Sequence, residues 1–105
     1  MIEYEVIQRE GDDVVLQLRG ELTGDVSSDE VKETLEEHYV DDGVRRIRVD
    51  LGPVSYITLE GIQILLSLWR ESKERGKEFQ AEGATGQVSA RLRVAGVTRL
   101  LDPDG

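Results

Sequence analysis

His38 is the one histidine of the chain, and its neighbours Glu36 and Glu37 make it the first residue to consider for catalysis. A histidine oriented by a carboxylate is a common general base. Such a base also needs a nucleophile or a metal to act on, and the sequence offers no motif for either. We therefore expect His38 to be an exposed helix residue without a catalytic role.

Motifs for metal and phosphate binding are equally weak. The chain has no cysteine, which excludes a thiol nucleophile and a cysteine-based zinc site, and no H-x-x-x-H or calcium-loop pattern occurs. Segment 83–86, Gly-Ala-Thr-Gly, precedes a predicted helix but lacks the G-x-G-x-x-G and G-x-x-x-x-G-K-[ST] patterns. Arg45, Arg46 and Arg48 form a basic cluster that a solvent-facing strand explains as well as an anion site does. The sequence thus predicts no enzyme, no cofactor and no metal.

Composition limits the possible partners. A chain of 105 residues is long enough for one domain, which we place at residues 1–105. The net charge of -9 repels phosphate backbones, so we expect no nucleic-acid binding, and the acidity serves either solubility or the steering of a basic partner. No apolar run exceeds three residues and the start shows no secretory signal. We expect no membrane span and a cytoplasmic location.

Hydrophobic periodicity predicts an α/β order of elements. Strands are expected at 4–10 and 13–19, joined by a turn at 11–12, with Gly20 ending the second strand. A helix capped by Ser27 and Glu30 follows, and its core stripe is Val31, Leu35 and Tyr39. The strand predicted at 46–51 completes a crossover unit, so it should lie parallel to the strand at 13–19.

A second helix is predicted over residues 59–74. Ile62, Leu65, Leu66 and Trp69 form its core stripe, whereas Ile64 and Leu68 lie off that stripe and either extend an exposed apolar patch or pack under the last helix. A short strand at 78–82 comes next. Thr85 can cap the last helix, whose expected core positions are Val88, Leu92 and Ala95, with Gly96 in the left-handed position after it.

The stretch from Val49 to Leu66 carries most of the functional information. It places Asp50 and Leu51 at the end of a strand and Gly61 in the first turn of a helix, while Gly-Glu-Leu at 20–22 follows the second strand. These pieces, in this order, resemble the STAS domain, the family of bacterial anti-sigma-factor antagonists. The resemblance implies an α/β STAS fold, a mixed sheet of four to five strands with helices packed chiefly on one face.

The same resemblance implies a function. Antagonists of this family dock the loop and the start of the second helix onto an anti-sigma factor of the serine-kinase type, which phosphorylates the first serine of an Asp-Ser-Ser-Gly motif and so ends the docking. Here that motif reads Thr58, Leu59, Glu60 and Gly61. Leu59 stands at the phosphoacceptor position and has no hydroxyl, so we expect the switch to be absent.

Three interpretations of this change remain open. The domain is a binder that cannot be switched off at this site, or Glu60 mimics a phosphate, or the domain is a scaffold or accessory subunit of a stress-signalling assembly or a lipid-transport ATPase. Thr58 could also be a displaced acceptor. Leu59 either extends the docking surface or covers the core at the start of the helix.

The predicted function is therefore regulatory protein binding, by a monomer or weak homodimer. The expected partner is an anti-sigma factor of the serine-kinase type, and binding of a small anion or nucleotide at the helix starts is a further possibility. The contact residues that we predict are Tyr56, Thr58, Leu59, Glu60, Ile62 and Gln63, with Glu21 and Thr23 in a neighbouring rim.

Overall fold

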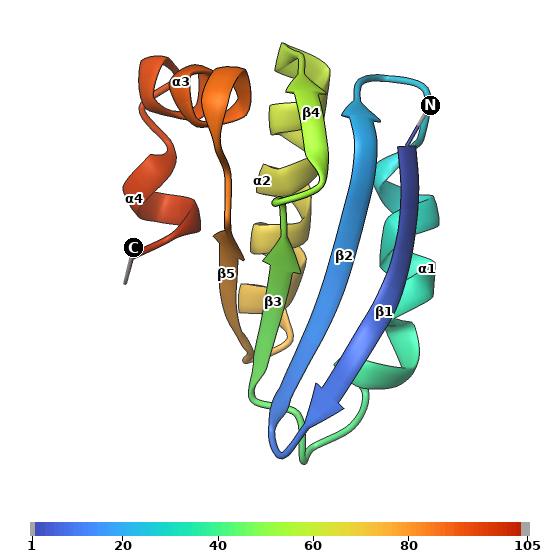
Figure 1. Ribbon diagram of the computed structural model, residues 1–105. Coiled ribbons are helices and arrows are strands. Elements are labelled where there is room, and N and C mark those ends of the chain that lie inside the picture. Colours follow the sequence, from blue (N-terminus) through green and yellow to red (C-terminus); the bar gives the residue numbers. More distant parts are fainter. Residues whose placement is uncertain (1, 104–105) are drawn as a thin grey trace.

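The computed structural model describes residues 2–103; Met1 and residues 104–105, including the end of the predicted domain, lie outside this range. Figure 1 shows a sheet with helices behind it and beside it. In chain order the elements are β1 (Ile2–Glu10), β2 (Asp13–Leu22), α1 (Ser28–Tyr39), β3 (Arg46–Asp50), β4 (Val54–Ile57), α2 (Leu59–Glu74), β5 (Glu78–Glu82), α3 (Gly86–Val94) and α4 (Thr98–Leu101).

Within residues 2–103 the sheet is mixed and has five strands. β1 and β2 form an antiparallel hairpin in which Glu10 pairs with Asp13, as the turn at 11–12 predicted. β2 pairs in parallel with β3, as the crossover pattern predicted, and β3 pairs in parallel with β5. The third parallel pairing joins β4 to the end of β2, so β2 has two partners along one edge. The predicted α/β class with a mixed sheet is confirmed.

Gly20 does not end β2, which is a correction to the sequence analysis. The strand continues to Leu22, and Gly20 has a φ of 106°, a conformation that side-chain-bearing residues rarely adopt. The pairing with β4 is irregular between Gly20 and Glu21. The glycine therefore marks a bend within the strand, and a bend at glycine looks like a strand end in the sequence.

Helices α1 and α2 cover one face of the sheet (Figure 1). Val31, Leu35 and Tyr39 of α1 are buried, as predicted, and the Ser27 hydroxyl accepts a hydrogen bond from the Glu30 N–H at 3.2 Å. The reciprocal bond of a full capping box, from the Ser27 N–H to the Glu30 carboxylate, is not formed within residues 2–103. α3 packs against β4, and α4 against β5.

The core stripe of α2 differs from the prediction. Ile64 and Leu68 are buried, 6% and 0% exposed, while Leu66 and Trp69 are only half-buried. The cause is that α2 contacts β5 and α4 as well as α1. An exposed patch built on Ile64 and Leu68 is therefore excluded, and of the two alternatives only packing inside the domain holds.

Smaller corrections concern residues outside the sheet. Ala95 is exposed although Val88 and Leu92 are buried, and Thr85 begins α3 without a side-chain cap bond. The predicted glycine cap of α3 is confirmed, because the Val97 N–H donates to the Leu92 carbonyl at 3.1 Å and Gly96 has a φ of 76°.

The side chain of His38 is 13% exposed, less than an exposed helix position predicts, and its Nε2 lies 3.7 Å from the Glu37 carboxylate. No helix among residues 2–103 is long and apolar enough to cross a membrane.

Candidate partner-binding site

Strand β4 presents Tyr56 at the surface. Val54 and Ile57 at its ends are buried, while Ser55 and Tyr56 between them are exposed, Tyr56 to 44%. Tyr56 is in register with Glu21 of β2, so these two predicted contact residues are neighbours across the sheet. Sequence reasoning missed this strand because its four residues do not alternate between apolar and polar.

Thr58 caps the start of α2. Its hydroxyl accepts a hydrogen bond from the Gly61 N–H at 3.3 Å, and its own N–H donates to the Leu22 carbonyl at 3.1 Å. Thr is a good N-cap residue, and Thr58 fills that role at the start of α2. The bond from the Thr58 N–H to Leu22 ties the start of α2 to the end of β2.

Leu59 is the first residue of α2 and projects into solvent, with 57% of its surface exposed. The alternative that Leu59 covers the core is therefore wrong. Ile62, one turn later, is only 4% exposed and belongs to the core, so its side chain is not available to a partner. Gln63 beside it is exposed. The predicted contact set thus divides into surface residues and one core residue.

Glu60 lies against the loop that follows β2. A Cβ added to Gly24 of that loop would be 3.6 Å from the Glu60 Cβ. In the same loop the Thr23 hydroxyl accepts a weak hydrogen bond from the Asp25 N–H at 3.4 Å. The predicted rim therefore adjoins the start of α2, and Glu60 in the first turn also interacts favourably with the helix dipole.

Gly61 allows α2 to approach β2 closely. A Cβ at this position would lie 2.2 Å from the Leu22 carbonyl oxygen and 2.8 Å from a side-chain carbon of Ile57. Only a residue without a side chain can occupy this point. The glycine that the sequence shares with the family motif is thus required by packing at the base of the site.

Gln87 supports the site and was missed by sequence reasoning. Its side-chain amide donates to the Ile57 carbonyl and accepts from the Ile57 N–H, both at 3.0 Å. The amide therefore continues the hydrogen bonding of β4 on the edge that faces α3. A glutamine in the first turn of a helix gives no signal of such a role, because the partner strand lies 30 residues away.

These residues form one surface, which we call the docking surface. It comprises the exposed or half-exposed residues at the ends of β2 and β4 and at the start of α2, which Figure 1 shows at one end of the molecule. The residues of the docking surface are Tyr56, Thr58, Leu59, Glu60, Gln63, Glu21 and Thr23.

Shifted pKa values occur away from the docking surface and have structural causes. Burial raises the pKa of Tyr39, and hydrogen bonds from the Gly43 N–H and from Arg9 lower the pKa of Asp41. Two residues of the basic cluster are engaged by carboxylates, since Arg46 binds Glu78 at 2.9 Å. Arg48 binds Glu82 at 2.6 Å. No group of three or more metal-ligating side chains occurs in the described part of the chain.

A model of the STAS domain family, described as "Mlab, STAS domain", matches residues 6–102. This chain belongs to the STAS domain family. Its STAS relatives include the anti-sigma-B factor antagonists of Listeria monocytogenes and of Listeria innocua. Each is 24% identical over 101 residues, covering 96% of this chain and 87% of the relative.

Solved structures of other proteins have a similar fold. The anti-sigma factor antagonist SpoIIAA in its unphosphorylated form is 18% identical with a TM-score of 0.69, over 93% of this chain and 83% of SpoIIAA. A sulfate transporter family protein from Wolinella succinogenes is 16% identical with a TM-score of 0.72, over 89% of this chain and 74% of that one. The predicted STAS fold is confirmed.

Proposed function

We propose that this STAS domain is a non-catalytic regulator of the anti-sigma-factor antagonist type, which binds a kinase-type anti-sigma factor in the cytoplasm through the docking surface. The relatives that cover nearly the whole chain are anti-sigma-B factor antagonists. The observation that carries the proposal is the 57% exposure of Leu59 at the first position of α2. An apolar side chain held in solvent by a capped helix is a suitable anchor for a protein partner.

The same residue removes the off-signal. Leu59 has no hydroxyl, so a kinase cannot attach a phosphoryl group to it, and the contact is not ended by added charge. Glu60 is a poor phosphate mimic because a carboxylate carries about half the charge of a phosphoserine. Its place in the first turn of α2 is explained by the helix dipole. We therefore favour a lasting contact over a charge-controlled one.

Binding is tested with purified anti-sigma factor of the serine-kinase type from the same genome, by isothermal titration calorimetry. Leu59→Asp should weaken binding at least about tenfold, because a charge replaces the apolar anchor. The matched control is Val40→Asp. Val40 is the C-cap residue of α1, lies outside the docking surface and is 63% exposed. Equal affinity of wild type and Leu59→Asp would falsify the proposed surface.

Phosphorylation is tested with the same kinase and ATP by intact mass spectrometry. The wild-type mass should stay unchanged, whereas Leu59→Ser, which restores an acceptor hydroxyl, should gain one phosphate. A stoichiometric phosphate on Thr58 of the wild type would contradict a binder without an off-signal.

A second candidate function uses the same exposed apolar residues. Tyr56 and Leu59 could equally anchor the domain permanently in a larger complex. That complex would be a stress-signalling assembly or a lipid-transport ATPase of which the domain is an accessory subunit. Size-exclusion chromatography with light scattering separates the self-assembling version from the antagonist. A monomer or weak homodimer is expected for the antagonist, and a large homo-oligomer would favour the scaffold.

A further inference from the structure

A hollow of about 340 Å³ lies between α3 and α4, away from the docking surface. Its walls are Ser89 and Arg93 from α3, Gly96 from the connection, and Thr98 and Arg99 from α4. Two arginines and two hydroxyl-bearing residues therefore line one hollow. A volume of this size matches the pockets that hold small ligands.

The polar side chains of this hollow have no partners within residues 2–103. Arg93 and Arg99 form no ion pair and no side-chain hydrogen bond there, and the hydroxyls of Ser89 and Thr98 form none. Elsewhere in the sheet and helices, arginines such as Arg48 and Arg75 bind carboxylates. Four unused polar groups on one hollow leave their hydrogen bonds to water or to a ligand.

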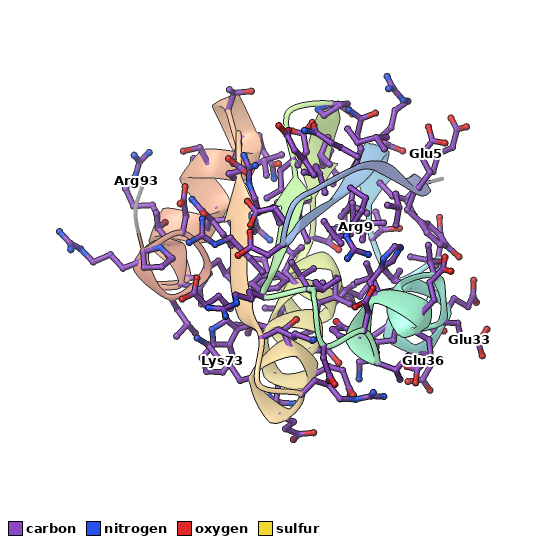
Figure 2. The ribbon with its side chains drawn as sticks, turned by 90° about the horizontal axis from the view of Figure 1, so that it is seen from below. Glu5, Arg9, Glu33, Glu36, Lys73 and Arg93 are labelled. Carbon is purple, nitrogen blue, oxygen red and sulfur yellow. The ribbon has the colours of Figure 1, made fainter. Side chains whose placement is uncertain are left out.

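Charge separates this region from the rest of the molecule. Residues 83–101 contain three arginines and no acidic residue, in a chain whose net charge is -9. Figure 2 shows Arg93 on the opposite side of the molecule from Glu33 and Glu36. Asp102, the next acid along the chain, accepts a hydrogen bond from Gln80 at 2.8 Å. The hollow is thus a local positive site on a negative protein.

Helix stabilisation explains only part of this arrangement. Arg91 and Arg93 in the last turn of α3 interact favourably with the helix dipole. Arg99 likewise lies in the single turn of α4, although the dipole of a four-residue helix is small. The dipole does not account for the two hydroxyl-bearing residues that line the same hollow. Guanidinium groups can only donate and hydroxyls can also donate, so the complementary ligand is an anion rich in acceptor atoms.

The number of charges indicates the class of anion. Two guanidinium groups match a phosphate monoester, which carries about -1.5 to -2 at neutral pH and presents three acceptor oxygens. A second hollow of about 90 Å³ shares Ser89 and Thr98 with the first and is lined further by Ala81, Leu92, Leu101 and Asp102 among others. Apolar walls and a carboxylate there favour an uncharged ester group.

We propose that the α3–α4 hollow binds a small phosphate monoester. Arg93 and Arg99 hold the phosphate, the hydroxyls of Ser89 and Thr98 donate to its oxygens, and the uncharged ester group lies towards Leu92. The proposal does not depend on the docking surface, so either can fail without the other.

The test is a titration followed by ¹⁵N NMR, with phenyl phosphate and inorganic phosphate as probes at constant ionic strength. Saturable shifts of the Gly96 and Thr98 amide signals are expected for both probes, with tighter binding of phenyl phosphate. Arg93→Gln and Arg99→Gln should each weaken binding about tenfold, since each removes a charged hydrogen-bond donor. Arg91→Gln, on the same helix but outside the hollow, should bind as wild type does.

Three outcomes would overturn the proposal. The first is the absence of saturable shifts with either phosphate. The second is equal affinity of Arg93→Gln, Arg99→Gln and Arg91→Gln, which would reduce the effect to general charge attraction. The third is equal affinity for inorganic phosphate and phenyl phosphate, which would remove the place for an ester group. Benzyl alcohol, which has the ring without the phosphate, should cause no shift at Gly96 or Thr98.

Discussion

At the scale of single residues, Gly61 shows how tightly the docking surface is built onto the core. Gly61→Ala would place a carbon 2.2 Å from the Leu22 carbonyl oxygen, so α2 would have to move away from β2. We expect the free energy of unfolding to fall by about 3 kcal/mol or more, at the upper end of overpacking effects. Urea unfolding followed by circular dichroism measures the change.

Gly24→Ala is the control for this prediction. Its added carbon would meet Glu60 at 3.6 Å, an ordinary contact, so the stability should stay within about 0.5 kcal/mol of wild type. Equal urea midpoints for Gly61→Ala and wild type would show that α2 can shift without cost.

The sequence could suggest contact residues for the docking surface but could not predict their exposure. Leu59 and Ile62 are both apolar and lie within one turn of α2, yet one is 57% exposed and the other 4%. Periodicity assigns Ile62 to the core stripe of α2. It cannot place Leu59, because Leu59 is the first residue of the helix and no preceding turn shows which face it lies on. Whether Leu59 covers the core depends on where the cap at Thr58 directs the chain, and that is a tertiary property.

At the scale of elements, the side chain of Gln87 joins α3 to β4. Gln87→Ala should leave the N–H and carbonyl of Ile57 without partners, which lowers the free energy of unfolding by about 1–3 kcal/mol. Hydrogen exchange at the Ile57 amide should accelerate more than at the other amides of β4. Gln63→Ala, at an exposed position, serves as the control. Unchanged exchange at Ile57 would rule out this role.

A second contact between elements links α1 to α2. The Ser72 hydroxyl donates to the Leu68 carbonyl at 2.9 Å, so the hydroxyl of Tyr39, 3.3 Å from Ser72, is the donor between them. Burial raises the pKa of Tyr39 above 10.0, with further effects of Glu36, Glu71 and Arg75 around it. Tyr39 is thus a buried group that resists ionisation.

This raised pKa predicts the sign of a pH effect. Below about pH 10 the phenol of Tyr39 is neutral in both the folded and the unfolded protein. As the pH rises further, the unfolded chain ionises first, so the free energy of unfolding falls until the pH has passed the pKa of Tyr39 in the folded protein. Tyr39→Phe should cost about 1 kcal/mol near neutral pH and lose less stability in alkali. Urea unfolding across an alkaline pH series measures both, and parallel curves for the two proteins would refute the prediction.

The sequence predicted helices and strands correctly where the apolar residues follow a single period. The helix over 59–74 and the parallel pairing of β2 with β3 follow from apolar spacing and from the crossover rule. β4 could not be found, because its pattern is buried, exposed, exposed, buried and its pairing with β2 continues past a glycine bend. The sequence left the burial of Ile64 and Leu68 open, because it depends on which elements α2 contacts, here β5 and α4 as well as α1.

At the scale of the whole molecule, one core runs from Ile2 to Leu101. It joins the hairpin at one edge of the sheet to the short helix α4 at the other, and it includes buried residues of β5 and α3. A continuous core in a chain of this size should unfold in a single step. The predicted single domain, residues 1–105, can be tested through that cooperativity.

Leu101→Ala is the sharpest test because Leu101 lies near the C-terminal end of the core and is 1% exposed. Removing its side chain should cost about 2–5 kcal/mol, whereas Leu100→Ala, at a residue that is 42% exposed, should cost far less. Trp69 on α2 and far-UV circular dichroism should report the same shifted urea midpoint, since the loss is shared by the whole domain. Two separate transitions, with the Trp69 signal unshifted, would mean that α4 melts on its own and that the cooperative unit ends before it.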